Sequence, residues 1–410
     1  MHPLRQTLHN ELHARPSTYF NAPAHVFHLA FLDQDDAARH IVNGFCDEYG
    51  IDAGPEVQQG EFAIGNALLK WELHTEFLTL TLMAPLEDGP LWPALPPALA
   101  AIAQKHAALL INANHIRVES ESSWKGGVDD YGFVDPLGSN LDQSRASVWS
   151  DLRVDRHGLC RMLVLNRHLD GRRLGRMMRR LLEIETYRLM ASLTLPVARA
   201  LSAELRDYEC ELVEISEANN ASETQDTKAL LDRITRLSAR VTQSSAQSRL
   251  RFSATQAYAE LVFERIAELS ESRTGDCQQL GIFIARRFRP TVRYCSSTDQ
   301  RLTRIDKTVA HLSSLLQARV QVEMEEQNGQ ILQALNARAD TQIRIQRAVE
   351  GLSIIAISYY LISLLKLVYE GGLTLGLTMS PRIALLVGAP LAALVLGVVY
   401  RRIRHARRPE

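Results

Sequence analysis

Two long apolar stretches, residues 352–369 and 383–400, constrain this 410-residue chain more than any other feature of its sequence. The first contains one charged residue, Lys366, and the second contains none. About 20 residues of α-helix cross the ~30 Å hydrocarbon layer of a bilayer, so each stretch is close to the length of a membrane span. A pair of buried core helices is the alternative, but two such stretches in succession favour a transmembrane hairpin.

The basic residues around these stretches predict their orientation. Arginines precede the first stretch and follow the second, whereas the connecting segment contains only Arg382. Because Lys and Arg are enriched on the cytoplasmic side of a membrane, we expect both flanks in the cytoplasm and only the short connection outside. The flanking arginines are Arg344, Arg347, Arg401, Arg402, Arg404, Arg407 and Arg408.

Bulk composition argues against several other classes of protein. Lys and Arg total 46 while Asp and Glu total 47, so no net positive charge attracts nucleic acid. The first thirty residues contain no basic segment followed by an apolar one, which predicts a cytoplasmic N-terminal part without a cleaved signal peptide. The five cysteines are scattered and never spaced C-x-x-C, so we expect reduced thiols.

The N-terminal part of the chain has the alternation of apolar and polar residues that is typical of strands. Phe77, Thr79 and Thr81, for example, alternate with leucines. The pattern predicts an α+β fold class that begins with a mixed α/β domain. We predict strands at 25–32, 68–84, 109–120 and 147–166, the last range with a turn at 155–158, helices at 34–49 and 94–107, and a long loop at 120–146.

Helical periodicity replaces this alternation after about residue 172. Amphipathic patterns cover 172–215, with a bend expected at Pro196, and 226–272, with interruptions near Gly275 and Pro290. A third pattern, with spacings of three and four, then continues into the first apolar stretch and predicts a long coiled-coil stalk. Its apolar positions are Leu302, Ile305, Val309, Leu312, Leu316, Val320, Met324, Ile331, Leu335, Ala339 and Ile343.

This stalk pattern suggests a homo-oligomer. A lone amphipathic helix would expose its apolar stripe to water, so identical stalks are expected to pair through it. The earlier helices of the same chain are the alternative cover. The predicted organisation is a cytosolic α/β domain at 1–175, a long-helix stalk at 176–350, two transmembrane helices with a short outer loop at 351–401, and a basic cytosolic tail at 402–410.

His9 and His13 are the candidates for metal ligands, because they lie four residues apart on a predicted N-terminal helix. A zinc metalloprotease helix carries H-E-x-x-H, whereas Glu11 here falls on the opposite face. Packing or solvated surface is the preferred interpretation. We therefore expect no metal, no cofactor and no catalytic residues.

Polar residues on the first apolar stretch share one helical face, because they are spaced by four, three and four. This face is predicted to line a pore or to pack against a neighbouring helix. Small residues on the second stretch form a small-x-x-x-small row that suits close helix packing. The polar face consists of Tyr359, Ser363, Lys366 and Glu370, and the small-residue face of Ala389, Ala393 and Gly397.

Several stretches resemble, in the same order, the bacterial membrane-anchored family with domain of unknown function 3422. They include "PLRQTLHNELHARP", "WELHTEFLTLTL", "VWSDLRVDRHGLCRMLVLNR", "RRLLEIETYRLMASLTLPVAR", "RRFRPTVRYC" and "RAVEGLSIIAISYYLISLL". The resemblance implies a location in the bacterial inner membrane and brings no catalytic residues. In topology alone the chain is similar to CorA-type transporters, but it lacks their Gly-Met-Asn signature and has "YEGG" at that place.

Two functions follow as expectations. The first is a non-enzymatic, oligomeric inner-membrane protein whose cytosolic domain acts as a sensor or scaffold, with the lipid bilayer and further copies of itself as partners. The alternative is a CorA-like ion channel or transporter whose first span lines the pore. Lys366 near the mouth of such a pore would repel cations, which weakens cation transport in particular.

Overall fold

The computed structural model describes residues 2, 4–11, 16–51, 54, 57–221, 227–374, 376 and 380–405. They form two compact units, Met1–Leu316 and Gln317–Glu410. We call the first the α+β unit and the second the C-terminal unit.

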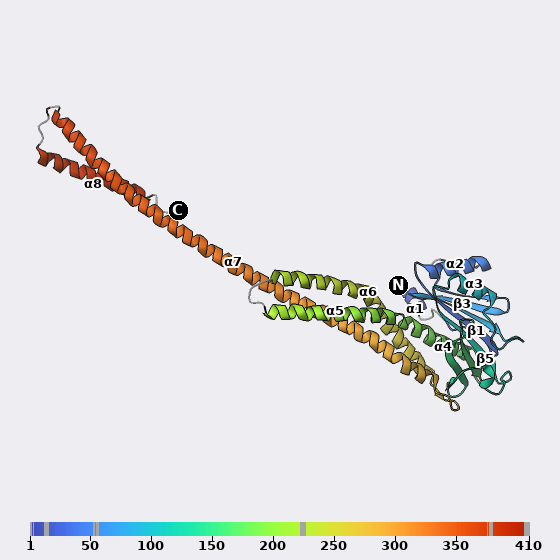
Figure 1. Ribbon diagram of the computed structural model, residues 1–410. Helices are drawn as coiled ribbons and strands as arrows, with labels where there is room; N and C mark the ends of the chain where they lie inside the picture. The colour runs from blue at the N-terminus through green and yellow to red at the C-terminus, as the bar shows by residue number, and fades with distance from the viewer. Residues whose placement is uncertain are drawn as a thin grey trace. The chain divides into compact units, whose positions relative to one another are not determined.

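A nine-stranded sheet forms the framework of the α+β unit (Figure 1). Its strand order is β2-β3-β4-β1-β5-β8-β7-β6-β9, and all neighbours are antiparallel except β5 and β8. The strands are β1 (Ala24–Leu32), β2 (Gln59–Ile64), β3 (Ala67–Leu73), β4 (Phe77–Pro85), β5 (Leu110–Ser120), β6 (Leu137–Leu141), β7 (Ala146–Val154), β8 (Cys160–Asn166) and β9 (Ser272–Arg273).

The helices account for most of the remaining described residues. A 3₁₀ turn, η1 (Asp129–Tyr131), lies in the connection between β5 and β6. The helices are α1 (Arg5–Glu11), α2 (Ala37–Tyr49), α3 (Pro97–Lys105), α4 (Gly171–Ser192), α5 (Thr194–Ala221), α6 (Thr227–Glu268), α7 (Leu280–Thr374) and α8 (Pro381–His405).

Successive side chains of the central strands point to opposite faces of the sheet. Apolar side chains lie on both faces, and helices cover both faces. Leu78 and Leu80 of β4 pack with α2 and α3 on one face. Phe77 and Met83 of the same strand pack with α4, α6 and the beginning of α7 on the other face. Side chains that point in either direction from these strands are therefore enclosed, including the polar ones.

A second core joins α5, α6 and the first part of α7. The first five positions of the predicted stalk seam are buried in it, from Leu302 to Leu316. Earlier helices of the same chain therefore cover this part of the apolar stripe. Further along, Val320 is half-buried, and the described side chains of Met324, Ile331, Leu335, Ala339 and Ile343 are exposed.

Four local predictions were wrong. The predicted strand at 68–84 is two strands, β3 and β4, with a turn between them. The predicted loop at 120–146 contains β6, whose buried Leu137 and Leu141 pair it with β7. The long first helix breaks at Leu193 rather than at Pro196. Helix α7 continues through Pro290, which lacks the N–H group that would bond to the carbonyl group one turn earlier. Because Pro290 is exposed, water can donate to that carbonyl group instead.

The C-terminal unit contains the two apolar stretches as helices. The end of α7 and nearly all of α8 are each long and apolar enough to cross a membrane, and among the described residues no part of either apolar segment is buried. The chain reverses direction between them (Figure 1). The sequence prediction of two apolar helices is confirmed.

Candidate functional site

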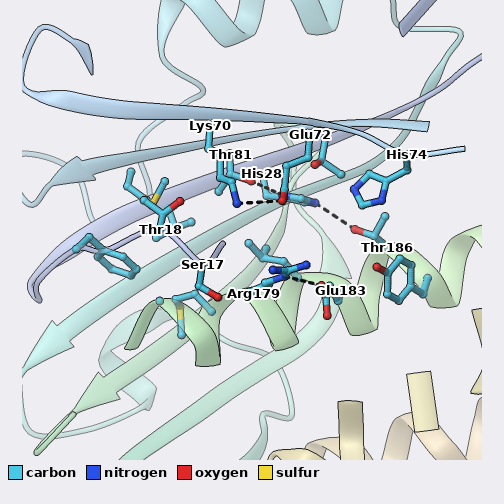
Figure 2. Close-up of a pocket in the computed structure, with 18 of the residues that line it drawn as sticks. Ser17, Thr18, His28, Lys70, Glu72, His74, Thr81, Arg179, Glu183 and Thr186 are labelled. Carbon is cyan, nitrogen blue, oxygen red and sulfur yellow. Dashed lines mark hydrogen bonds and ion pairs between the residues drawn. The ribbon is translucent and has the colours of Figure 1, made fainter. Parts of the chain in front are cut away.

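A cavity of about 60 Å³ lies in the α+β unit between the sheet and α4 (Figure 2). Its walls come from β1, β3 and β4, from α4, and from the segment 17–20 that precedes β1. The polar residues that line it are His28, Lys70, Glu72, Arg179, Glu183 and Tyr187, among others.

Two glycines of α4 allow the segment before β1 to lie directly on the helix. A Cβ atom at Gly175 would be 1.9 Å from the carbonyl oxygen of Thr18, and one at Gly171 would be 2.7 Å from that of Phe20. Both distances are far below van der Waals contact, so only glycine permits this approach. The approach closes one side of the cavity.

A row of polar side chains crosses the sheet beneath α4. Strand register aligns Lys70, Thr81, His28, Asn114 and Cys160 across five neighbouring strands. All but Thr81, which is half-buried, are buried. A buried polar group is costly unless it is hydrogen-bonded, so such a row within a core requires partners.

His28 is held as a neutral imidazole at the centre of this row. Its Nδ1 is 2.8 Å from the hydroxyl oxygen of Thr81, and its Nε2 is 3.1 Å from that of Thr186 on α4. Burial lowers the pKa of His28 to about 3, because the charged form loses its hydration. Both ring nitrogens are occupied, so His28 connects the sheet to α4.

Lys70 brings a positive charge into the cavity wall. Its ammonium group donates to Glu72 Oε1 at 2.9 Å and to the carbonyl oxygen of Pro16, so two of its three N–H donors are used. The third donor has no partner among the residues that the structure describes. Because Lys70 is only 6% exposed, a ligand in the cavity is a suitable acceptor for it.

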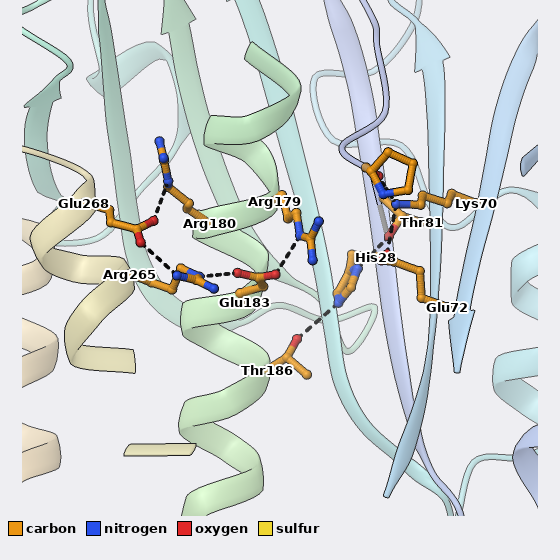
Figure 3. Close-up of polar contacts among 11 residues, drawn as sticks. His28, Lys70, Glu72, Thr81, Arg179, Arg180, Glu183, Thr186, Arg265 and Glu268 are labelled. Carbon is orange, nitrogen blue, oxygen red and sulfur yellow. Dashed lines mark hydrogen bonds and ion pairs between the residues drawn. The ribbon is translucent and has the colours of Figure 1, made fainter. Parts of the chain in front are cut away.

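The opposite wall is formed by one end of an alternating chain of charges (Figure 3). Glu183 accepts from Arg179 Nε at 2.7 Å and from Arg265 Nε at 2.5 Å. Arg265 in turn contacts Glu268 at 2.9 Å, and Glu268 accepts from Arg180 at 2.8 Å. The glutamate in the cavity is thus shared by two arginines, which fixes the orientation of the Arg179 side chain.

Aromatic rings close the cavity beside this chain. The rings of Tyr187 and Tyr258 stack with centroids 5.6 Å apart, and Tyr187 meets Phe77 edge to face at 6.2 Å. Burial raises the pKa of Tyr187 to about 12, so its hydroxyl stays protonated and can donate or accept a hydrogen bond.

Asn114, beside His28 in the polar row, is fully buried, and neither the oxygen nor the nitrogen of its amide group has a hydrogen-bond partner in the described part of the chain. A bound water molecule or a small polar ligand would remove this energetic penalty. Cys160, next in the row, is a neutral thiol because burial raises its pKa to about 12. The row is therefore suited to hydrogen bonding and not to nucleophilic attack.

The residues predicted from the sequence as pore-lining or packing residues all lie in the C-terminal unit. Tyr359, Ser363, Lys366 and Glu370 are exposed, and Lys366 Nζ is 3.9 Å from Glu370 Oε1, so these two share a face. The roles predicted for them stay predictions. The small residues Ala389, Ala393 and Gly397 of α8 are likewise exposed.

His9 is exposed on α1, and His13 lies outside the described residues. Among the described residues no group of three or more His, Cys, Asp or Glu side chains is placed to hold a metal ion.

A family model described as "Protein of unknown function (DUF3422)" matches residues 1–407, nearly the whole chain. The chain belongs to this family. The resemblance expected from the sequence motifs is therefore confirmed. No curated protein matches this DUF3422 member significantly. The family description assigns no activity, so the roles of the cavity residues rest on their geometry.

The sequence analysis missed the cavity of this DUF3422 chain, although several of its residues, such as Glu72 and Glu183, fall in the stretches that carry the resemblance. Lys70 and Glu72 flank Trp71 on β3, and Glu183 begins the "EIETYR" stretch of α4. A strand with charged residues on one face usually exposes that face to water. The helix α4, which covers it, lies about 100 residues away in sequence, so no local signal shows the enclosure.

Proposed function

We propose that this chain is a non-enzymatic, membrane-anchored sensor whose α+β unit binds a small polar ligand in the cavity between the sheet and α4. The proposal has two parts, an anchor and a binding site, and each has its own test. The exposure of the two apolar helices carries the first part, and the enclosed charged cavity supports the second.

The anchor is supported by apolar side chains that no residue in the described part of the protein covers. Leu352, Ile355 and Ile362 of α7 are 73%, 69% and 63% exposed, and Leu386 of α8 is 77% exposed. Burial of one such side chain contributes roughly 1.5–3 kcal/mol, so leaving two whole helices in water is strongly unfavourable. Lipid removes this cost along the full length of both helices.

The bacterial inner membrane is the compartment that we propose. The arginines before and after the apolar helices favour a cytoplasmic position for the α+β unit and for the C-terminal flank. Membrane-impermeant maleimide tests this orientation in intact cells. Ser380→Cys, in the connection between α7 and α8, should be labelled, whereas the exposed Cys210 of α5 should be labelled only after lysis. Labelling of Cys210 in intact cells would contradict the orientation.

Fractionation tests the anchor itself. The full chain should sediment with membranes and require detergent for extraction, and a chain that ends after Glu350 should remain in the supernatant. The α+β unit has its own cores within Met1–Leu316, so the shortened chain should still fold. Sedimentation of the shortened chain with membranes, or recovery of the full chain without detergent, would refute the anchor.

The size of the cavity limits what the sensor binds. A cavity of about 150 Å³ holds benzene, so 60 Å³ admits only a small polar group or the end of a longer ligand. Lys70 offers a donor and Tyr187 offers a hydroxyl, so the bound group needs an acceptor. Both carboxylates are already paired, and the buried histidine is neutral and fully bonded, which favours binding over acid–base chemistry.

A thermal-shift screen of small carboxylates and amino acids tests the binding site. At least one compound should raise the melting temperature of the wild type and leave the double variant Lys70→Met/Glu72→Leu unchanged. Replacing both charges together avoids leaving one buried and unpaired. Lys105→Met removes an exposed lysine and should respond like the wild type. Equal responses from all three proteins would refute binding at the cavity.

Oligomerisation through 317–350 is part of the proposal. Met324, Ile331 and Leu335 remain exposed there, by 54%, 57% and 54%, and a second copy of the same helix is a suitable cover. Analytical ultracentrifugation of the full chain in detergent should show more than one subunit. A strictly monomeric protein would rule this part out.

A channel is the second candidate. The observation in its favour is that Tyr359, Ser363, Lys366 and Glu370 are all exposed on α7, which leaves a polar face for a central path between subunits. Ion flux into liposomes that contain the purified protein separates the candidates. Flux that changes with Ser363→Leu supports a channel, and absence of flux leaves the anchored sensor.

A further inference from the structure

We propose that the α+β unit contains a second binding site, which takes the phosphate group of a ligand. The site is a hollow of about 230 Å³ beside α4, and we call it the arginine groove. It shares no lining residue with the cavity described above. Its charged lining consists of Arg145, Arg173, Arg176, Arg180, Asp142 and Glu268.

The lining has an excess of positive charge. Four arginines against two carboxylates give the lining a net charge of +2. Arg173, Arg176 and Arg180 come from one face of α4, and Arg145 reaches the groove from the turn between β6 and β7. Guanidinium groups converging from two elements can contact several oxygens of one phosphate at the same time.

Three of these arginines have weak partners or none. Arg176 is exposed and forms no ion pair among the described residues. Arg145 is 3.7 Å from the carboxylate of Asp142, and Arg173 is 3.8 Å from that of Asp170, and all four of these side chains are more than one third exposed. Ion pairs of this kind contribute little to stability, so these arginines can turn to an anion at small cost.

Arg180 can also turn to a ligand without leaving a carboxylate unpaired. It donates to Glu268 at 2.8 Å, but Glu268 also accepts from Arg265 at 2.9 Å. If Arg180 moved to a bound anion, Glu268 would keep Arg265 as its partner. The groove therefore offers arginines that are positioned by the fold and remain available for binding.

The turn that carries Arg145 is fixed in an unusual conformation. Asp142, Gln143 and Ser144 all have positive φ angles, of 46°, 59° and 68°. Residues other than glycine rarely adopt a positive φ angle, and several such residues in succession persist only where surrounding contacts enforce the conformation. Here the amide of Arg145 donates to Asp142, and the amide of Asp142 donates to the carbonyl oxygen of Leu269 at 3.4 Å, which ties the turn to the other wall of the groove.

The charge and the number of donors favour phosphate over carboxylate. A single carboxylate offers two oxygens and one negative charge, whereas a phosphate monoester offers three oxygens and close to two charges. Both a soluble phosphorylated compound and a phosphate-bearing lipid headgroup carry this chemistry. The experiment therefore uses one probe for each source.

Calorimetry on the full chain in a non-ionic detergent at low salt tests the site. One titration uses inorganic pyrophosphate, and the other uses dihexanoyl phosphatidic acid below its micelle concentration. Arg176→Gln is the informative variant, because it removes no ion pair among the described residues. Arg172→Gln is the matched control, since it removes the same charge from an exposed position on the same helix outside the groove.

At least one probe should bind the wild type, with a dissociation constant about tenfold or more higher in Arg176→Gln and less than twofold higher in Arg172→Gln. Binding of pyrophosphate alone identifies a soluble ligand, and binding of the phosphatidic acid alone identifies a lipid. Absence of binding by both probes overturns the proposal. Equal weakening by the two variants also overturns it, because it shows only attraction to the charge of the helix.

Discussion

The contact between α4 and the segment before β1 makes a sharp prediction for Gly175→Ala. In a helix that lacks neighbours this substitution stabilises by roughly 0.5–1 kcal/mol, because alanine restricts the unfolded chain. At Gly175 the new Cβ atom would lie 1.9 Å from a backbone oxygen, about 1.5 Å closer than ordinary contact, so the segment 17–20 has to move.

The cost of this movement follows from the contacts that it breaks. Overpacking alone costs about 1–3 kcal/mol. Pro16 directly precedes the displaced segment, and its carbonyl oxygen accepts a hydrogen bond from Lys70 that the movement would break. A hydrogen bond to a charged group contributes roughly 1.5–3 kcal/mol. Less the gain from alanine, Gly175→Ala should lower the free energy of unfolding by about 2–5 kcal/mol.

Urea titration of the full chain in detergent, followed by tryptophan fluorescence, measures this difference. Gly44→Ala is the control, because Gly44 lies in helix α2 of the same unit with nothing within 4 Å of the added Cβ. It should leave the midpoint unchanged or raise it. A Gly175→Ala protein as stable as Gly44→Ala would refute the contact and, with it, the closed side of the cavity.

Three further predictions concern other residues. The pKa of His28 is about 3 in the folded protein, so as the pH falls below 6.5 only the unfolded chain binds a proton at this residue, and the folded state loses stability. Removal of this group in His28→Gln should reduce that loss by about 1.4 kcal/mol per pH unit between pH 6 and 4, measured by urea titration. Glu183→Gln should lower the free energy of unfolding by about 2–3 kcal/mol in the same assay, because two arginines lose the carboxylate that they share. Glu214→Gln, which removes one carboxylate of an exposed ion pair, should lower it by less than about 1 kcal/mol. Leu302→Ala should lower stability by about 2–4 kcal/mol, and Leu335→Ala, which is exposed in one chain, should instead reduce only the subunit number measured by ultracentrifugation.

The sequence predicted those elements whose signals are local. The residues from Phe77 onward alternate clearly, and the apolar residues of α7 recur at three and four, so extended and helical structure were predicted at these places, although the turn between β3 and β4 was not. β6 was missed because "LGSNL" contains two apolar residues among a glycine and polar residues, and only pairing with β7 makes it a strand. The prediction of an interruption at Pro290 was wrong for a similar reason. The helix tolerates this proline because the residue is exposed to solvent, which its neighbours in sequence do not reveal.

The cavity was beyond prediction because its charged residues look the same as surface residues in sequence. Arg179 and Glu183 are spaced like a solvated ion pair on a helix, and the structure shows that they face a buried strand. Lys70 is a charged residue in an alternating strand, and its burial depends on a helix encoded far downstream. The close approach at Gly175 likewise joins residues that no sequence spacing connects.

The core on the α4 side of the sheet has a consequence for synthesis of the chain. Strand β8 ends at Asn166, yet the core that covers this face includes Ala259, Ile284 and Phe288. At roughly 5–20 residues per second, the ribosome needs about 6–24 s to add the intervening residues. During that interval α4 is already available to cover part of this face, but the apolar surface that α6 and α7 cover in the folded protein is still exposed. Nascent chains of this protein should therefore recruit chaperones well before their most apolar residues have been translated.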